Sequence, residues 1–307
     1  IEMRKISHAN AGLTLPDGWD TNKNPWIATT RTDWMDEIFR DALYHRHNVA
    51  LNTGTENAKN RVSFAYDSND GVLINTWNRK TTLHYNGEFK LNKWVTINET
   101  FSWVNTKSRS KDTNSGYTGA IISAIMMPSS APVYDANGNY HGVTTEDPEY
   151  IAKYGSNYAD IHGDAVNPVR LLTAENRYNR TSDVWSTTSL QIGNILPGLK
   201  FVSRFTYNLT NNYYKNFNPR RPEIGKPQDF NELNESSYRY SRWMTENTLT
   251  YDNTFGKHTV GALLSTTADR TYSRGLSIYG KNLSDESDYL QYISFAESTS
   301  QDDYLTG

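Results

Sequence analysis

The sequence predicts an all-β fold, a transmembrane antiparallel β-barrel of which about eight strands are present as an open portion, with long extracellular loops. Apolar and polar side chains alternate in strand-length segments, so that Leu83, Tyr85 and Phe89 share one face of residues 81–91. A barrel strand that crosses a membrane needs about 9–11 tilted residues with one face toward lipid and the other toward a watery lumen. Tight turns alternate with long polar connections, which is the second mark of an outer-membrane barrel.

Composition narrows the class of protein. The chain has 307 residues, a net charge of −3 and a pI near 6.2, a balance that argues against a nucleic-acid partner, which usually requires a basic face. Mean hydropathy is −0.74, and no apolar run reaches the ~18 residues of a transmembrane helix. Cysteine is absent, which excludes disulfides and Cys-ligated zinc. The sequence has no initiator Met, signal peptide or terminal strand, so we expect an internal piece of a longer polypeptide.

The strand pattern can be followed in order. Residues 1–44 show turn signals and one helical stretch at 33–43, without strand alternation. Alternation then predicts strands at residues 47–53, 61–67, 81–91, 94–104, 183–192, 199–213, 237–251 and 257–268. Glu99 falls on the otherwise apolar face of the fourth strand, where a lipid-facing carboxylate is costly, so we expect a register error or a bulge there.

Two long loops, 107–180 and 214–236, interrupt this pattern, and a third is expected to begin within 272–298. Antiparallel connectivity predicts that these loops and residues 1–44 emerge on one side of the sheet, with the turns near residues 92, 194 and 252 on the other. The sheet should be open, with unpaired edges at about His47 and Ala268. The residues predicted on its outer face are Val62, Phe64, Leu83, Tyr85, Phe89, Phe201, Phe205 and Leu249.

Several segments resemble one protein family. Residues 32–40 (TDWMDEIFR), 47–51, 63–72 with its Asp-Gly pair, 90–95 (KLNKWV) and 133–140 (VYDANGNY) resemble the SusC/RagA family of TonB-dependent outer-membrane transporters. The family fold is a barrel of about 22 strands around a plug. The resemblance implies that residues 1–44 are an extracellular loop region before the first strand. Residues 45–307 would be part of the barrel domain, with the plug domain and the barrel closure absent.

The resemblance also implies a function. It is TonB-dependent import of a nutrient oligomer, a glycan in preference to a peptide, across the outer membrane of a Gram-negative bacterium. The implied partners are a SusD-like surface lipoprotein, TonB through a segment absent here, the oligosaccharide or peptide ligand and membrane lipid, assembled as a dimer of transporter–lipoprotein pairs. A soluble all-β module that binds carbohydrate or protein remains the alternative. No catalytic constellation, metal-ligand set or cofactor fingerprint is present, so we expect neither an enzyme nor a cofactor.

The long loops supply the candidate ligand contacts. Aromatic rings there can stack on sugars or on peptide side chains, and arginines can orient cargo, although each ring equally fits loop packing or contact with a partner. Aromatic residues within the strands are interpreted as lipid-facing bulk and interfacial girdle. The predicted substrate-binding residues are Tyr117, Tyr134, Tyr140, Tyr213, Tyr214, Phe217, Arg220 and Arg221.

Overall fold

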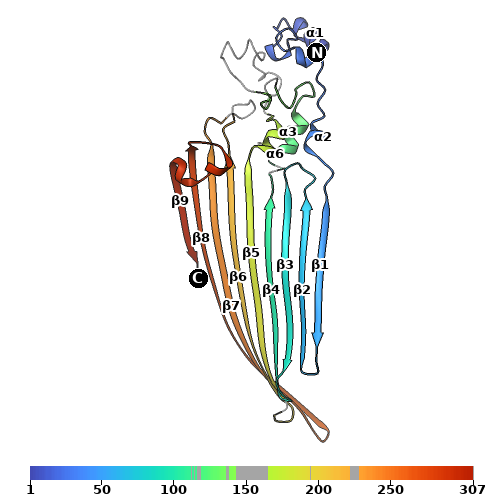
Figure 1. Ribbon diagram of the computed structural model, residues 1–307, viewed down its shortest axis with the longest axis vertical. Helices are drawn as coiled ribbons and strands as arrows, with labels where there is room; N and C mark the ends of the chain where they lie inside the picture. The colour runs from blue at the N-terminus through green and yellow to red at the C-terminus, as the bar shows by residue number, and fades with distance from the viewer. Residues whose placement is uncertain are drawn as a thin grey trace.

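The computed structural model describes residues 1–111, 113, 115, 119–135, 138–142, 165–193, 195–221 and 228–306. These residues form one nine-stranded antiparallel sheet in which every strand pairs with its neighbours in the chain (Figure 1). The strands are β1 (Tyr44–Gly54), β2 (Ala58–Asp70), β3 (Trp77–Lys90), β4 (Val95–Arg109), β5 (Asn176–Gly193), β6 (Leu199–Asn218), β7 (Glu232–Phe255), β8 (His258–Leu283) and β9 (Ala296–Thr306).

The connections separate as predicted. Residues 1–43, the connections 71–76 and 284–295, and the described parts of the connections 110–175 and 219–231 lie at one end of the strands, here called the loop side (Figure 1). The turns 55–57, 91–94 and 256–257 and the described turn residues 195–198 lie at the other end, the turn side. Strand length grows from 11 residues in β1 to 26 in β8.

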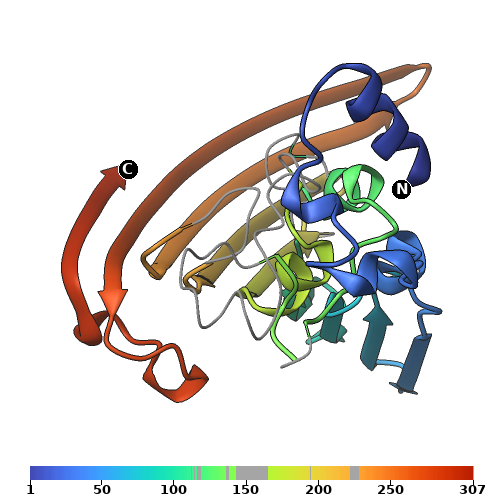
Figure 2. The same ribbon diagram turned by 90° about the horizontal axis from the view of Figure 1, so that it is seen from above.

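The sheet has one apolar and one polar face. Directly opposed residues share a face, so the row Phe64, Leu83, Trp103 and Val184 continues the same apolar surface across β2 to β5. The sheet curves, and helices lie over its concave side (Figure 2). The neighbouring row of Trp185, Asn208 and Arg242 lies on the opposite face and lines a hollow of about 470 Å³. That opposite face also carries Arg177 and Glu232, which share a cavity with residues of the helix at 168–173, so it is the concave face.

The apolar face is therefore convex. All eight residues predicted on the outer face lie on it, which confirms the predicted register.

The strand count is nine among the described residues rather than eight, and the loop expected within residues 272–298 is shorter. β8 runs past the predicted end at residue 268 to Leu283, and Leu276 and Ile278 continue its alternating pattern. The glycines at 275 and 280 lie within the strand and do not end it. β9 then pairs with the loop-side part of β8, from Ser273 to Leu283.

The sheet is open in the described residues, since β1 pairs with β2 alone and β9 with β8 alone. The turn-side part of β8, which contains Ala268, has no partner on its second side within these residues. The predicted edges at His47 and Ala268 therefore lie on unpaired strand segments, and β9 adds a third.

The expected break at Glu99 does not occur. Pairing runs on without a bulge, with Gly87 and Thr188 directly opposite Glu99. The Glu99 carboxylate accepts hydrogen bonds from Ser186 Oγ at 2.9 Å and from Thr188 Oγ1. Two hydroxyls of the neighbouring strand thus satisfy the charge, so the register does not need to change.

Short helices occupy the loop side. They are α1 (Glu2–Asn10), α2 (Trp34–Ile38), α3 (Ala120–Met126), α6 (Pro168–Thr173) and the 3-10 helices η1 (Asp17–Trp19), η2 (Pro25–Ala28), η3 (Asp288–Leu290) and η4 (Ile293–Phe295). Asp33 caps α2 by accepting from the backbone N–H of Met35 at 3.1 Å and of Asp36 at 3.2 Å. The helix predicted at 33–43 ends at Ile38, because Phe39 turns extended and bridges to Leu73. Within the described residues, no helix has the length and apolar character needed to cross a membrane.

The main hydrophobic core lies in these loops rather than against the sheet. We call it the loop cap, formed by residues 1–43, 71–76 and the described parts of 110–175. Its buried side chains are Trp19, Ile27, Trp34, Ile38, Leu73, Ala120, Ala124, Met127, Ala131, Val133, Ala165, Val166, Val169, Leu171 and Leu172. Trp34 Nε1 donates to the carbonyl of Pro128 at 3.0 Å, and Thr32 Oγ1 donates to that of Ala131 at 2.7 Å. The segment before β1 is therefore tied to the β4–β5 connection.

We expect Leu172→Ala to destabilise the loop cap by about 2–5 kcal/mol, because it leaves a cavity at a fully buried position. The loss should be local, since the sheet is held by its own ladder of hydrogen bonds. Amide hydrogen exchange would show faster exchange in α2 and α3 and unchanged exchange in β5 to β7. The matched control is Leu196→Ala in an exposed turn. Equal loss of protection in the strands would contradict a separate cap core.

Candidate functional site

A cavity of about 200 Å³ lies beneath the loop cap, at the loop-side end of the concave face. The strand ends of β5, β6 and β7 supply Arg177, Asn218 and Glu232 to its wall. The facing wall comes from α6 and the β6–β7 connection, which supply Arg170 and Arg221. The cavity is thus the place where the concave wall of the sheet meets the cap.

Local sequence explains why α6 stands here. Pro168 occupies its first turn, where a missing N–H costs nothing, and Asn167 Oδ1 accepts from the backbone N–H of Arg170 at 3.3 Å. The side chain of Arg170 is 4% exposed and donates to the carbonyl of Arg220. The same contact fixes the start of the β6–β7 connection against the helix.

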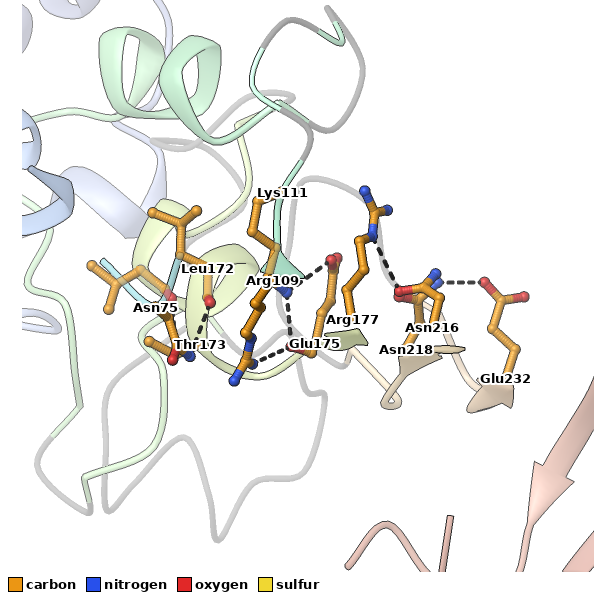
Figure 3. A network of polar contacts seen from close by, with 11 residues as sticks. Asn75, Arg109, Lys111, Leu172, Thr173, Glu175, Arg177, Asn216, Asn218 and Glu232 are labelled. Atoms are coloured by element: carbon orange, nitrogen blue, oxygen red, sulfur yellow. Dashed lines mark hydrogen bonds and ion pairs between the residues drawn. The ribbon is translucent and has the colours of Figure 1, made fainter. Parts of the chain in front are cut away.

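Two groups of polar contacts hold the cavity wall (Figure 3). In the first, Lys111 Nζ donates to the backbone carbonyl of Glu175 at 2.7 Å and pairs with its carboxylate at 3.3 Å. Arg109 Nη2 donates to the same carbonyl at 2.7 Å. Both cations reach across from the end of β4 to the residue before β5, so they close the base of the long β4–β5 connection.

The second group lies on the strand ends. Asn218 Nδ2 donates to one oxygen of Glu232 at 2.8 Å, and Tyr279 OH donates to the other at 2.5 Å. Arg177 Nε donates to Asn216 Oδ1 at 3.4 Å (Figure 3). The polar wall is therefore ordered before any ligand arrives.

The cavity has a positive balance of charge. Its described lining residues carry four cations, Lys111, Arg170, Arg177 and Arg221, against the carboxylates of Glu175 and Glu232. Burial lowers the pKa of the Lys111 amine to about 8, against the opposing field of Glu175. The described wall offers hydrogen-bond donors and acceptors for a polar cargo.

The structure places the predicted site residues in different surroundings. Arg221 lines the cavity. Tyr214 lies on the concave face of β6, whereas Tyr213 lies on the convex face and donates to Glu235 Oε1 at 3.1 Å. Phe217 is 1% exposed and packs on the convex side with Leu233 and Leu283.

The remaining predicted residues lie nearer the cap. Arg220 Nε donates to the carbonyl of Asp229 at 3.2 Å, beside the cavity rather than in its wall. The rings of Tyr134 and Tyr140 are 5.4 Å apart, and Tyr140 OH lies 2.6 Å from Thr173 Oγ1. Tyr117 lies outside the described residues.

Sequence reasoning missed most of the cavity wall. Lys111, Glu175 and Arg177 fell inside the loop predicted at 107–180, but β5 begins at Asn176. Continued alternation of small polar and charged residues toward the start of β5 was the available signal. For metals, no group of three or more His, Asp or Glu side chains gathers in the part of the chain that the structure describes.

Comparison with known proteins agrees with this architecture. The chain is 25% identical to the TonB-dependent receptor P3 of Formosa agariphila over 240 residues, which are 76% of this chain. It is 32% identical to the TonB-dependent receptor SusC of Bacteroides thetaiotaomicron over 117 residues, which are 37% of this chain. The predicted resemblance to the SusC/RagA family is confirmed. These matches span 22% and 11% of the two relatives, and no family model matches the chain.

Solved structures show the same fold. The RagAB peptide transporter superposes on 91% of the chain with a TM-score of 0.70 at 17% identity, and its "closed-closed" state superposes on 90% with a TM-score of 0.68. The chain spans about 30% of that transporter chain in both. The nine-stranded open sheet of the described residues is therefore similar to a portion of a SusC-like barrel.

Lys111 makes stability depend on pH. Its amine titrates near pH 8 in the folded chain and near 10.5 when unfolded, so the folded state binds fewer protons between these values. Stability should therefore rise as pH increases from about 8 to 10.5, where the buried charge is lost. Urea unfolding of the wild type and Lys111→Met, followed by tryptophan fluorescence, should show this gain in the wild type and not in Lys111→Met. Lys257→Met, at an exposed turn, is the control. Parallel pH profiles of all three proteins would contradict the assignment.

Proposed function

We propose that this chain is part of the barrel of a TonB-dependent transporter that imports a nutrient oligomer across the outer membrane of a Gram-negative bacterium. The single observation that carries the proposal is the two-faced sheet, apolar on its convex side and polar on its concave side. The sequence similarity to two TonB-dependent receptors supports it.

The dimensions of the apolar face fit a membrane. On β4 the convex apolar residues lie between Val95 and Trp103, interrupted by Glu99, and on β5 they lie at the two ends of the stretch from Val184 to Ile192. Nine residues at about 3.3 Å each span about 30 Å along a strand, or roughly 23 Å after a tilt of about 40°. Outer-membrane barrels carry an apolar band about 25 Å tall.

The alternative, a soluble all-β binding module, is disfavoured by the same face. Phe64 is 48% exposed, Phe205 49% and Leu264 66%, and they belong to one continuous convex surface. A soluble monomer rarely exposes so large an apolar patch to water.

The loop side would then be extracellular, with residues 1–44 as a loop region and residues 45–307 as barrel. The cargo would be selected at the cavity and the cap, where it arrives. We assign a glycan in preference to a peptide on the family resemblance, together with a SusD-like lipoprotein over the loop side and TonB as the source of energy. A dimer of such pairs completes the proposed assembly.

The membrane placement is tested by two neighbouring residues of β6 in the full-length transporter. Phe205 lies on the convex face and Thr206 on the concave face. Phe205→Lys should cost about 2–4 kcal/mol in lipid, whereas Thr206→Lys faces the lumen and should cost under about 1 kcal/mol. Urea titration of the protein folded into vesicles would measure both. Equal costs, or recovery of the wild type without detergent, would contradict the proposal.

The cargo site is tested by uptake. Arg221→Gln and Tyr214→Ala should each weaken transport about three- to tenfold, because each removes one contact of roughly 1 kcal/mol while others remain. Tyr213→Ala, one residue along β6 on the convex face, is the matched control and should transport normally. Growth of cells on the cognate nutrient at equal expression would report uptake. An effect of Tyr213→Ala alone would place the site on the wrong face.

A further inference from the structure

Three cations stand side by side on the convex face near the loop side. Arg79 on β3 lies directly opposite Lys107 on β4, and Lys107 lies directly opposite Arg180 on β5. We call this row the cation stripe. Lys107 and Arg180 are exposed. The stripe therefore presents a linear positive charge across three neighbouring strands.

Such a row opposes folding unless an anion compensates it, because like charges directly across paired strands destabilise the sheet. Asp70 pairs with Arg79 and neutralises it. Lys107 and Arg180 make no ion pair with any residue that the structure describes. Two adjacent cations are thus left for an anion outside this part of the chain.

Aromatic side chains accompany the stripe on the same face. The rings of Trp77 and Tyr178 are 6.5 Å apart, as are those of Tyr178 and Tyr213. The Arg79 guanidinium lies 5.6 Å from the centre of the Trp77 ring. Trp and Tyr beside cations are typical of a membrane–water interface, where the rings meet lipid and the polar atoms meet water.

The level of the stripe identifies the anion. Each cation lies four residues beyond the last apolar row, formed by Leu83, Trp103 and Val184. Four residues are about 13 Å along a strand and about 10 Å along the membrane normal after tilt. Long basic side chains can fold back toward the hydrocarbon boundary, which brings their charges to the depth of lipid headgroups.

We propose that Lys107 and Arg180, the two cations of the stripe without an ion pair in the described residues, bind the phosphate groups of a membrane lipid in the leaflet on the loop side. This inference rests on the proposed function, because it needs the convex face in a membrane. The two positive charges lie on neighbouring strands, and Tyr178 and Tyr213 pack against the sugar or acyl part of the same lipid. The lipid in turn relieves the repulsion within the stripe.

The test uses the full-length transporter in detergent with diphosphorylated lipid A as the probe. Lys107→Gln combined with Arg180→Gln should weaken binding at least about tenfold, measured by native mass spectrometry across a lipid titration. Lys200→Gln combined with Lys257→Gln removes two exposed cations near the turn side and should bind as the wild type does. Lys107→Arg combined with Arg180→Lys should also retain affinity.

Three results would overturn the inference. The first is equal lipid A binding by the two neutralised double variants. The second is binding of dephosphorylated lipid A as tight as that of the diphosphorylated form. The third is complete displacement of the lipid by millimolar inorganic phosphate, which would indicate a site for a free anion. Failure of the proposed function is recorded separately, by absence of the wild-type protein from the outer-membrane fraction. A protein present in that fraction with unaltered lipid binding in the neutralised variant fails this inference alone.

Discussion

The alternation of side chains between two surroundings is the constraint on which the rest of this structure depends. In each strand, one residue faces the convex side and the next faces the concave side, so the apolar and polar rows must stay aligned across neighbouring strands. A slip of one residue would turn Phe101 and Trp103 inward and Ser102 outward. This explains why the register runs unbroken through Glu99, whose charge is satisfied by two hydroxyls in place of a bulge.

A sheet that commits its apolar side chains to the convex face has few left for an inner core. The molecule accordingly places its buried apolar residues at the loop side, where Trp34, Ile38 and Leu172 pack together away from the strands. The cap then roofs the concave surface, and its α6 forms one wall of the polar cavity. The positions of the core and of the cavity therefore have one cause, the placement of the strands' apolar side chains on the convex face.

Period-two alternation was sufficient to predict the strands, their faces and the two sides of connections, because it is a local property of each segment. It failed where glycine and serine replaced bulky residues, so the loop-side end of β8 and all of β9 were missed. The cavity was less accessible to prediction. Arg221 was predicted as a charged loop residue. Lys111 and Glu175 were not, because they are 64 residues apart in sequence and meet only in the folded chain. Arg177 lies at a strand end that no local pattern marks. The separation of Tyr213 from Tyr214 required the register, since the aromatic character of both residues is the same.

The ties between the segment before β1 and the β4–β5 connection also bear on how the chain folds. Thr32 and Ala131 are 99 residues apart in sequence, and four complete strands lie between them. Closing so long a loop has a large entropic cost, whereas each hairpin needs only a few residues to close. The hairpins can therefore pair in order along the chain at a lower entropic cost than the cap contact, which favours closure of the cap after β1 to β4 have paired. A cap that closes after the strands have paired leaves the concave surface accessible while the sheet forms.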